Sequence, residues 1–242
     1  AEFNWKQGAV NVTASGLETR IQNAGPEQII NLLSSRIKNA EKTMANNISE
    51  GVYSDGTGTG GKQIGGLQSL IADAGTGTVG GIDSSTYTFW KNQTSGDVAS
   101  IDTSAILLDA EMKNMWLETC RGNEKCDLIV SDQTLYKVFW DNLSDIQRIT
   151  DSNTGVKGFN SLKFVTADVV MEGGPAIHNS GIPATHMYFL NTDYLKFRVH
   201  SETNFVPFDQ RNPVNQDALV VPILFAGNLT VSNRSLQGVV YT

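Results

Sequence analysis

The sequence predicts an α+β fold, in which helices and strands occupy different stretches of the chain. Apolar residues recur every three or four positions from Pro26 to Ile48, as in a long amphipathic helix, and two further helical patterns lie between residues 102 and 146. After residue 158 the chain is mostly β-branched and aromatic in short runs bounded by turn residues, which is typical of strands. Helices and strands therefore segregate along the sequence.

The first stretch, residues 1–14, has the pattern of a strand with Phe3 and Trp5 on one face. No capping residue or turn signal introduces it, no hairpin partner follows nearby, and the first residue is Ala1 instead of Met. We therefore expect the sequence to begin inside a larger protein. We also expect this strand to lack its partner, which would leave exposed N–H and C=O groups that invite irregular edge pairing.

The best-defined element is the helix that Pro26 opens and Gly51 ends. About 25 residues at 1.5 Å each give a rod of roughly 37 Å. Six apolar residues form a stripe along it: Ile30, Leu33, Ile37, Ala40, Met44 and Ile48. The opposite face is polar and includes Lys38, Glu41 and Lys42. A stripe this narrow predicts a helix that crosses the structure as a strut, outside the centre of a core.

A glycine-rich segment follows, SDGTGTGGKQIGG, at residues 54–66. Gly56, Gly61 and Lys62 match most of the phosphate-loop pattern G-x-x-x-x-G-K-[ST], but Gln63 stands where Ser or Thr must hold the magnesium ion. Such loops also follow a buried strand and open a helix, whereas here a helix precedes the glycines. We interpret the segment as a flexible connection that needs positive φ at several positions, with nucleotide binding as the minor alternative.

Between residues 97 and 200 two shorter helices are expected. The first begins near Asp102 and turns four residues inward: Ala105, Leu108, Met112 and Met115. The second follows a short buried strand, Asp127–Val130. Residues 151–158 are predicted to form an exposed turn, and the stretches on either side of Thr192 and Asp193 to form a hairpin.

Composition and motifs argue against several classes of protein. The 242 residues carry a formal net charge of −7, unlike proteins that grip nucleic acid electrostatically. No run of about 18 apolar residues could span a membrane. Neither the three histidines nor Cys120 and Cys126 have zinc-ligand spacing, and both thiols are expected to be reduced. No G-x-S-x-G elbow or EF-hand loop occurs, so we expect no catalytic residue, cofactor or metal site, and no enzyme activity.

A strut helix, a glycine-rich segment, a protruding strand and a long terminal strand, in this order, resemble one family. It is the major capsid proteins of tailed bacteriophages and prophages, with the Hong Kong 97-type fold. The similarity is greatest in AEFNWKQGAVNVTASGLE, KNAEKTMANNISEGVYSDGTGTGGKQIGGLQSLIAD and TVGGIDSSTYTFWKNQ, and near the end in HMYFLNTDYLKFR and AGNLTVSNRSLQGV. It runs over nearly the whole chain and implies a capsid protein that lacks its N-terminal region.

The resemblance implies four parts. Residues 1–24 would be the returning strand of an extended loop, and residues 25–96 the spine helix and glycine-rich connection of the peripheral domain. Residues 97–200 would form the axial domain, with the turn 151–158 at the local fivefold or sixfold axis. Residues 201–242 would be terminal strands that return to the peripheral domain. The glycines would let the connection bend differently in pentamers and hexamers.

The implied function is self-association, as pentamers and hexamers, into an icosahedral shell that encloses double-stranded phage DNA without sequence-specific binding. Scaffolding and portal proteins are further implied partners. The implied location is the virion, assembled in the bacterial host cytoplasm. The arm, the spine face and the axial turn would supply the subunit contacts: Phe3, Trp5, Lys6, Lys38, Glu41, Lys42, Asn153 and Lys157.

Two alternatives stay open: an encapsulin-like nanocompartment around protein cargo, and a nucleotide-dependent enzyme that uses Gly56 to Lys62. We expect no self-catalysed isopeptide cross-link, because residues 222–229 contain no acid where cross-linking members of the family have a Glu. Because the first strand is expected to be unpaired, we also expect this chain alone to stay monomeric or to form small, irregular oligomers instead of closed shells.

Overall fold

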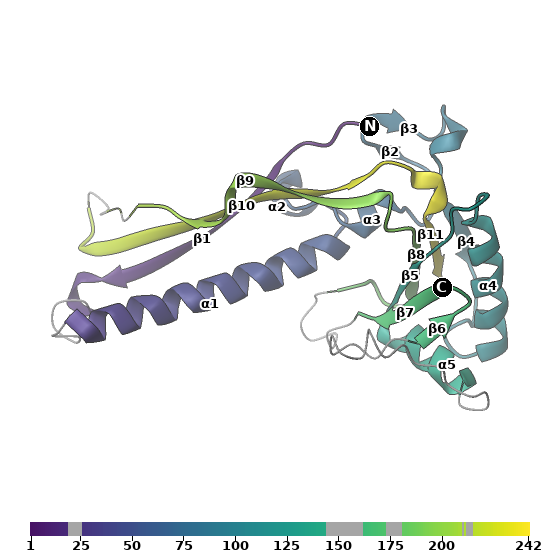
Figure 1. The fold of residues 1–242 in the computed structure, drawn as a ribbon, viewed down its shortest axis with the longest axis horizontal. Coiled ribbons are helices and arrows are strands. Elements are labelled where there is room, and N and C mark those ends of the chain that lie inside the picture. The colour runs from purple at the N-terminus through teal and green to yellow at the C-terminus, as the bar shows by residue number, and fades with distance from the viewer. Residues whose placement is uncertain (19–25, 144–161, 173–180, 210, 212–214) are drawn as a thin grey trace.

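The computed structural model describes residues 1–18, 26–143, 162–172, 181–209, 211 and 215–242, with the backbone alone for residues 26–33. The molecule has two parts, an elongated arm and a compact body at one end of it (Figure 1). Helices pack on mainly antiparallel sheets, which confirms the predicted α+β class. The turn predicted at 151–158 lies outside the described residues.

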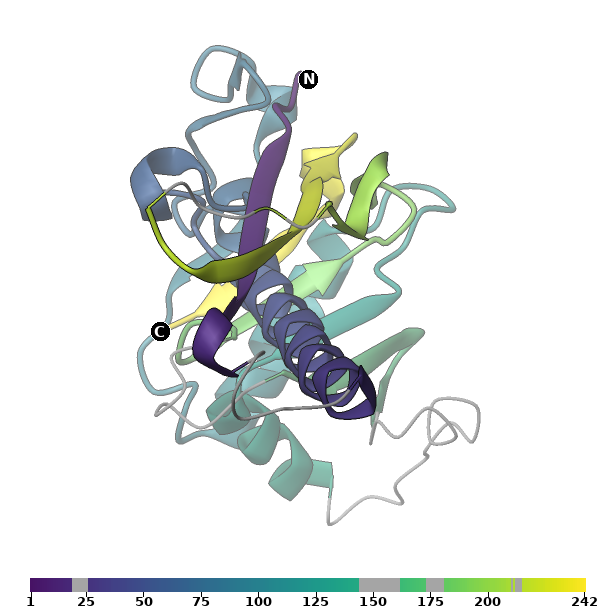
Figure 2. The same cartoon turned by 90° about the vertical axis from the view of Figure 1, so that its left-hand side faces the viewer.

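The arm is one long helix laid along a three-stranded antiparallel sheet (Figures 1 and 2). Its elements are α1 (Pro26–Tyr53), β1 (Lys6–Ser15), β10 (Ala218–Val231) and β9 (Leu195–Pro207), with β10 in the middle of the sheet. The helix has 28 residues, which at 1.5 Å each is about 42 Å. Gly51, predicted to end the helix, lies inside its last turn.

β1 is paired with β10 along its whole length, from Lys6 opposite Gly227 to Ser15 opposite Ala218. The prediction that the first strand lacks a partner is therefore wrong. Its partner lies at the other end of the chain, where no local turn signal in the sequence could reveal it. The reason to expect irregular pairing of this strand is therefore removed, although β1 is an edge strand of its sheet.

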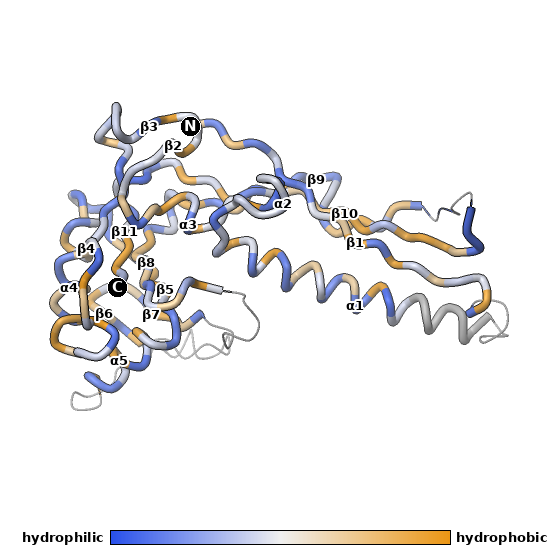
Figure 3. Tube along the Cα trace, turned by 180° about the vertical axis from the view of Figure 1, so that it is seen from behind, coloured by the Kyte–Doolittle hydropathy of each residue, from blue (hydrophilic) through white to orange (hydrophobic). Residues whose placement is uncertain are grey.

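A small core joins the helix to this sheet. Its buried members come from α1, β1 and β10: Val12, Ala40, Met44, Val221, Ile223 and Phe225. The predicted stripe of α1 is confirmed at Ala40 and Met44, which are buried, whereas Ile37 and Ile48 are half-buried. β10 supplies three of these six residues, and hydrophobic residues follow one another along it (Figure 3).

Near the far end of the arm, Arg36 fastens α1 to the first strand. Its guanidinium donates a hydrogen bond to the carbonyl of Thr13 at 2.6 Å and pairs with the carboxylate of Glu18 at 2.8 Å. The hydrogen bond from Arg36 lowers the pKa of the Glu18 carboxyl. Because the pair is partly exposed, it positions the helix more than it stabilises the fold.

The body is built on a six-stranded mixed sheet. Its strands, in spatial order, are β4 (Gln93–Asp97), β11 (Gly238–Tyr241), β8 (His186–Leu190), β5 (Leu128–Ser131), β7 (Ala167–Met171) and β6 (Leu162–Phe164). α4 (Ala105–Glu118) packs against β4 and β11, and α5 (Gln133–Leu143) packs against β7 and α4. Leu108, Met112 and Met115 are buried in this core as predicted, while Ala105 is half-buried.

The two stretches predicted to form a hairpin around Thr192 and Asp193 lie in different sheets. β8 pairs with β5 and β11 in the body, whereas β9 pairs with β10 in the arm. The turn is where the chain passes from body to arm, and the carboxylate of Asp127 fixes it by accepting a hydrogen bond from Thr192 N at 2.8 Å. The hairpin prediction is wrong because a turn signal does not say whether the flanking strands pair with each other.

Short elements connect arm and body. They are α2 (Gly58–Gly61), α3 (Leu67–Leu70), β2 (Thr78–Val79), β3 (Ile82–Asp83), η2 (Thr88–Trp90) and η4 (Arg234–Leu236). The buried guanidinium of Arg234 holds them together through hydrogen bonds to the carbonyls of Leu70, Thr76 and Trp90 at 2.6, 3.2 and 3.4 Å. Burial lowers the pKa of Arg234 to about 10.

Candidate functional site

The glycine-rich segment folds back onto the end of α1. Gly66 is buried against the last turn of the helix, and a Cβ at this position would lie 2.4–2.5 Å from Ser54 N, Gly51 O and Val52 O. The Ser54 hydroxyl donates to Gly51 O at 3.0 Å and to Ile64 O at 2.7 Å. A residue with a side chain would push the segment off the helix, so Gly66 serves packing.

Asn228 of β10 fixes the segment to the rest of the arm. Its side-chain oxygen accepts hydrogen bonds from Gly65 N at 3.1 Å and Leu229 N at 3.0 Å, and its amide donates to Asn4 O at 2.8 Å. The ammonium of Lys6 donates to Gly61 O. Three distant parts of the chain meet at this one amide, and the segment is packed at these positions.

The need for positive φ in this segment is confirmed. Gly56, Gly60 and Gly61 have φ values of 74°, 65° and 77°, and Thr59 has 53°. The segment lacks the phosphate-loop geometry, because α1 precedes it in place of a strand and α2 and α3 have four residues each. Nucleotide binding here has no support from the backbone.

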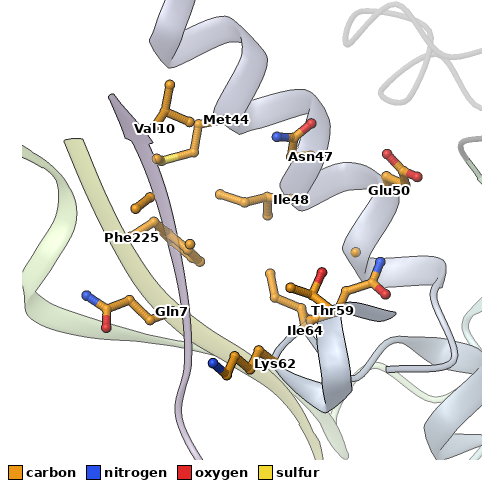
Figure 4. A pocket seen from close by; sticks show the side chains of 14 residues that line it. Gln7, Val10, Met44, Asn47, Ile48, Glu50, Thr59, Lys62, Ile64 and Phe225 are labelled. Carbon is orange, nitrogen blue, oxygen red and sulfur yellow. The ribbon is translucent and has the colours of Figure 1, made fainter. Parts of the chain in front are cut away.

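A cavity of about 460 Å³ lies between β1, the end of α1 and the glycine-rich segment (Figure 4). Its apolar wall consists of Val10, Met44, Ile48, Ile64 and Phe225. Its polar residues include Gln7, Asn47, Glu50, Thr59 and Lys62. The wall contains no His or Cys beside Lys62 and Glu50, and its one hydroxyl side chain is Thr59, so the cavity suits an apolar group better than it suits chemistry.

The predicted contact residues that the structure describes lie in two separate places. Phe3 is half-buried against the body, and Lys6 reaches the glycine-rich segment. Trp5 is 58% exposed, and its ring meets the ring of His200 in a T-shaped arrangement with the centroids 5.5 Å apart. The α1 candidates, Lys38, Glu41 and Lys42, are exposed along the arm. Asn153 and Lys157 lie outside the described residues. Phe3, Trp5 and Lys6 therefore lie together where the arm meets the body, apart from the three candidates on α1.

Sequence reasoning missed the exposed apolar surfaces of the body. Ile106, Leu107 and Leu117 project from α4. Val165 and Met171 project from the β6–β7 hairpin, and an aromatic pair, Tyr87 and Phe89, from the loop before β4. The sequence could have predicted the α4 surface, because α4 also has apolar residues on the side opposite its predicted stripe.

These features point to a protein that acts through its surfaces. Within the described residues, no group of three or more His, Cys, Asp or Glu side chains could hold a metal ion. No helix in the described part of the chain is long and apolar enough to cross a membrane. Several exposed apolar surfaces on an elongated chain are typical of a subunit that binds other proteins.

Several solved structures that are similar to nearly all of this chain are chains of phage capsids or of an encapsulin. A chain of the cyanophage A-1(L) capsid matches with a TM-score of 0.66 and 17% identity, over 99% of this chain and 76% of the capsid chain. The capsid of Myoviridae phage XM1 matches with a TM-score of 0.59 and 15% identity, over 98% and 73%. The SrpI encapsulin of Synechococcus elongatus PCC 7942 matches with 0.61 and 8%, over 98% and 73%.

At these identities the likeness establishes the fold. The long helix on its sheet and the compact body make the fold that this chain has in common with the phage capsid and encapsulin chains. The predicted Hong Kong 97-type fold is confirmed. No known protein family matches the sequence, and no curated protein does.

Proposed function

We propose that this chain is the major capsid protein of a tailed bacteriophage or prophage, a structural protein that self-assembles into an icosahedral shell. The observation that carries the proposal is the fold. Two phage capsid chains match 98–99% of the chain, so every described element has a place in it.

The two parts of the molecule suggest the division of labour. The proposal makes the arm, with β1, α1, β9 and β10, the peripheral domain, and the body the axial domain. Residues 1–24 and 25–96 keep their implied places as the continuation of an extended loop and as the spine with its connection. The group 97–200 forms the axial domain except for residues 195–200, which begin β9 in the arm sheet. Since β4 and β11 lie in the body sheet, the proposal takes β4 out of the group 25–96 and β11 out of the peripheral group 201–242.

The proposed partners are other copies of the chain, as pentamers and hexamers, together with scaffolding and portal proteins. A net charge of −7 suits a container that confines DNA by enclosure, since a strongly basic inner wall would bind DNA tightly. The proposed location is the virion, after assembly in the bacterial host cytoplasm.

The test is assembly of the chain expressed with its neighbouring genes. Light scattering after size-exclusion chromatography and electron microscopy should find uniform particles of megadalton mass with icosahedral symmetry. Failure to form any defined ring or shell across a wide range of protein concentration and salt would overturn the proposal.

A second candidate, an encapsulin-like compartment, is favoured by one observation. The TM-score of the SrpI encapsulin, 0.61, lies between the 0.66 and 0.59 of the two phage capsid chains, although its sequence identity is only 8%. The contents of purified particles distinguish the two candidates. A capsid should contain DNA that is protected from nuclease, or carry a portal, whereas a compartment should contain a protein cargo in a fixed ratio to the shell protein. Gene neighbours of terminase and portal type favour the first.

The third candidate, an enzyme that uses Gly56 to Lys62, has no structural observation in its favour. Titration calorimetry with ATP and magnesium should detect no binding. Micromolar binding that the substitution Lys62→Ala removes would revive it.

A further inference from the structure

Two exposed apolar surfaces lie toward opposite ends of the six-stranded sheet. α4 packs on β4 and β11 at one end, while β6 is the edge strand at the other. On α4, Ile106 is 81% and Leu117 65% exposed. On the β6–β7 hairpin, Val165 is 63% exposed. Removing side chains of this size from water is favourable, so each surface is a place where another protein could bind.

The α4 surface consists of Ile106, Leu107, Ala110 and Leu117. The opposite side of the same helix, with Leu108, Met112 and Met115, is already buried in the body core. Apolar side chains therefore lie on two sides of α4, and only one of these sides is covered. Ala110 lies one turn after Ile106 and is exposed, and the exposed Lys113 and Asn114 one turn further along separate it from Leu117.

Val165 occupies a backbone position that does not suit it. Phe164 pairs with Ala167, so Val165 and Thr166 form a two-residue hairpin turn. The φ of Val165 is 53°, and such a first turn position favours Gly, Asn or Asp. A β-branched residue there is strained. Since the side chain is also exposed, the fold of the single chain gains nothing from it, and strain of this kind occurs where a side chain has a function.

We propose, on the basis of the proposed shell function, that the Val165 turn of one copy of this chain inserts into the α4 surface of the next copy. The contact joins two different surfaces of identical chains, so repeating it builds a ring when the rotation from one copy to the next closes. The two apolar partners lie at opposite ends of one sheet, which is where a subunit between two neighbours needs them. The exposed Val165 packs on the small side chain of Ala110, beside Ile106.

The charges of α4 disfavour the alternative in which two α4 surfaces meet face to face. The helix carries Asp109, Glu111 and Glu118 against one base, Lys113. Lys113 already pairs with Asp109 at 2.5 Å on the same helix. Two copies of this helix in contact would bring carboxylates of like charge together, whereas the turn Val165–Thr166 carries no charge.

Cross-linking between different chains tests this contact. One preparation carries Ala110→Cys and the other Val165→Cys, each with a different tag and with Cys120→Ser, since Cys120 is partly accessible while Cys126 is buried. Mild oxidation of the mixture should give a disulfide-linked dimer that contains both tags. Each preparation alone should give at least tenfold less dimer. A control mixture of Ala45→Cys, on the exposed side of α1, with Val165→Cys should also give little.

The outcomes decide for or against the contact. No excess of the mixed dimer over the control overturns the proposal, and so does an equally strong dimer from Ala110→Cys alone, which would mean face-to-face pairing. Uniform shells without the mixed cross-link would reject this contact and leave the shell function standing. Absence of both shells and cross-link would reject both.

The substitution Val165→Asn provides an independent readout. Because Asn tolerates positive φ, the melting temperature of the dissociated chain should rise by about 2–4 °C, while the fraction of chain in rings or shells should fall at least tenfold. Thr166→Asn is the matched control beside it and should leave assembly within twofold. Unchanged assembly of Val165→Asn would contradict the proposal.

Discussion

The arm and the body are stabilised in different ways. The body encloses a large core in which a mixed sheet is covered by α4 and α5, and residues such as Ile129, Val169 and Phe189 are fully buried. The arm has one helix on three strands, a core of six buried apolar residues, and two free sheet edges. The body therefore tolerates the loss of one contact better than the arm does, and the arm depends on a few side chains and on the long ladder of β10.

The largest effect is expected for the centre of the arm core. Phe225 is buried, stacks on Phe197 with ring centroids 6.0 Å apart, and contacts Phe205 at 5.5 Å. Phe225→Ala should cost about 3–5 kcal/mol of local stability. Hydrogen exchange followed by mass spectrometry should find α1 and β1 deprotected and the body unchanged. The matched variant Phe189→Ala, in the body, should lower protection from exchange in the body sheet. If Phe225→Ala lowered protection equally in the arm and in the body, the arm would not be a separate unit.

The next largest loss of stability is expected for the apolar stripe of α1, where the structure shows which of the predicted residues are buried. Met44→Ala removes a side chain that is only 3% exposed and should cost about 2–4 kcal/mol in a denaturant melt. Ile37→Ala should cost less than half as much, because Ile37 is half-buried. Equal costs for the two would mean that the helix sits deeper on the sheet than this structure has it.

The glycine-rich segment should respond according to what surrounds each glycine. Gly66→Ala would place a Cβ within 2.4–2.5 Å of backbone atoms of α1 and should cost about 1–3 kcal/mol, through displacement of the helix end. Gly61→Ala meets nothing within 4 Å, so only its φ of 77° opposes the change, at about 1 kcal/mol. A reversed order in thermal melts would show that the segment leaves α1 in solution.

A smaller effect than that of Gly66→Ala is expected at the amide that joins the arm to its root. Asn228→Ala removes hydrogen bonds to Gly65, Leu229 and Asn4 and should cost about 1–2 kcal/mol. Asn11→Ala, on the exposed side of β1, is the control and should change stability by less than about 0.5 kcal/mol. If both variants melt alike, the N-terminal residues are held by β1 pairing alone.

The sequence predicts the local elements of both parts but not how they are joined. The helix α1 and the inward face of α4 follow from apolar spacing, which is a local property. The partner of β1 does not, since β1 and β10 are at opposite ends of the chain. For the same reason the turn at Thr192 was assigned to a hairpin, although it leads from one sheet to another. The contact surfaces were predicted from charged and aromatic residues, whereas Val165 stands out only through its φ, which a sequence does not contain.

The late position of β10 and β11 has a consequence for the timing of synthesis. β10 is the middle strand of the arm sheet, and β11 lies inside the body sheet. β1 has no partner until β10 has been made, and β4 joins β8 only through β11. A nascent chain that lacks residues 218–241 therefore has neither a finished arm nor a finished body to offer to its neighbours. We expect such partly made chains to stay out of any assembly, because they lack the complete surfaces that another copy would bind.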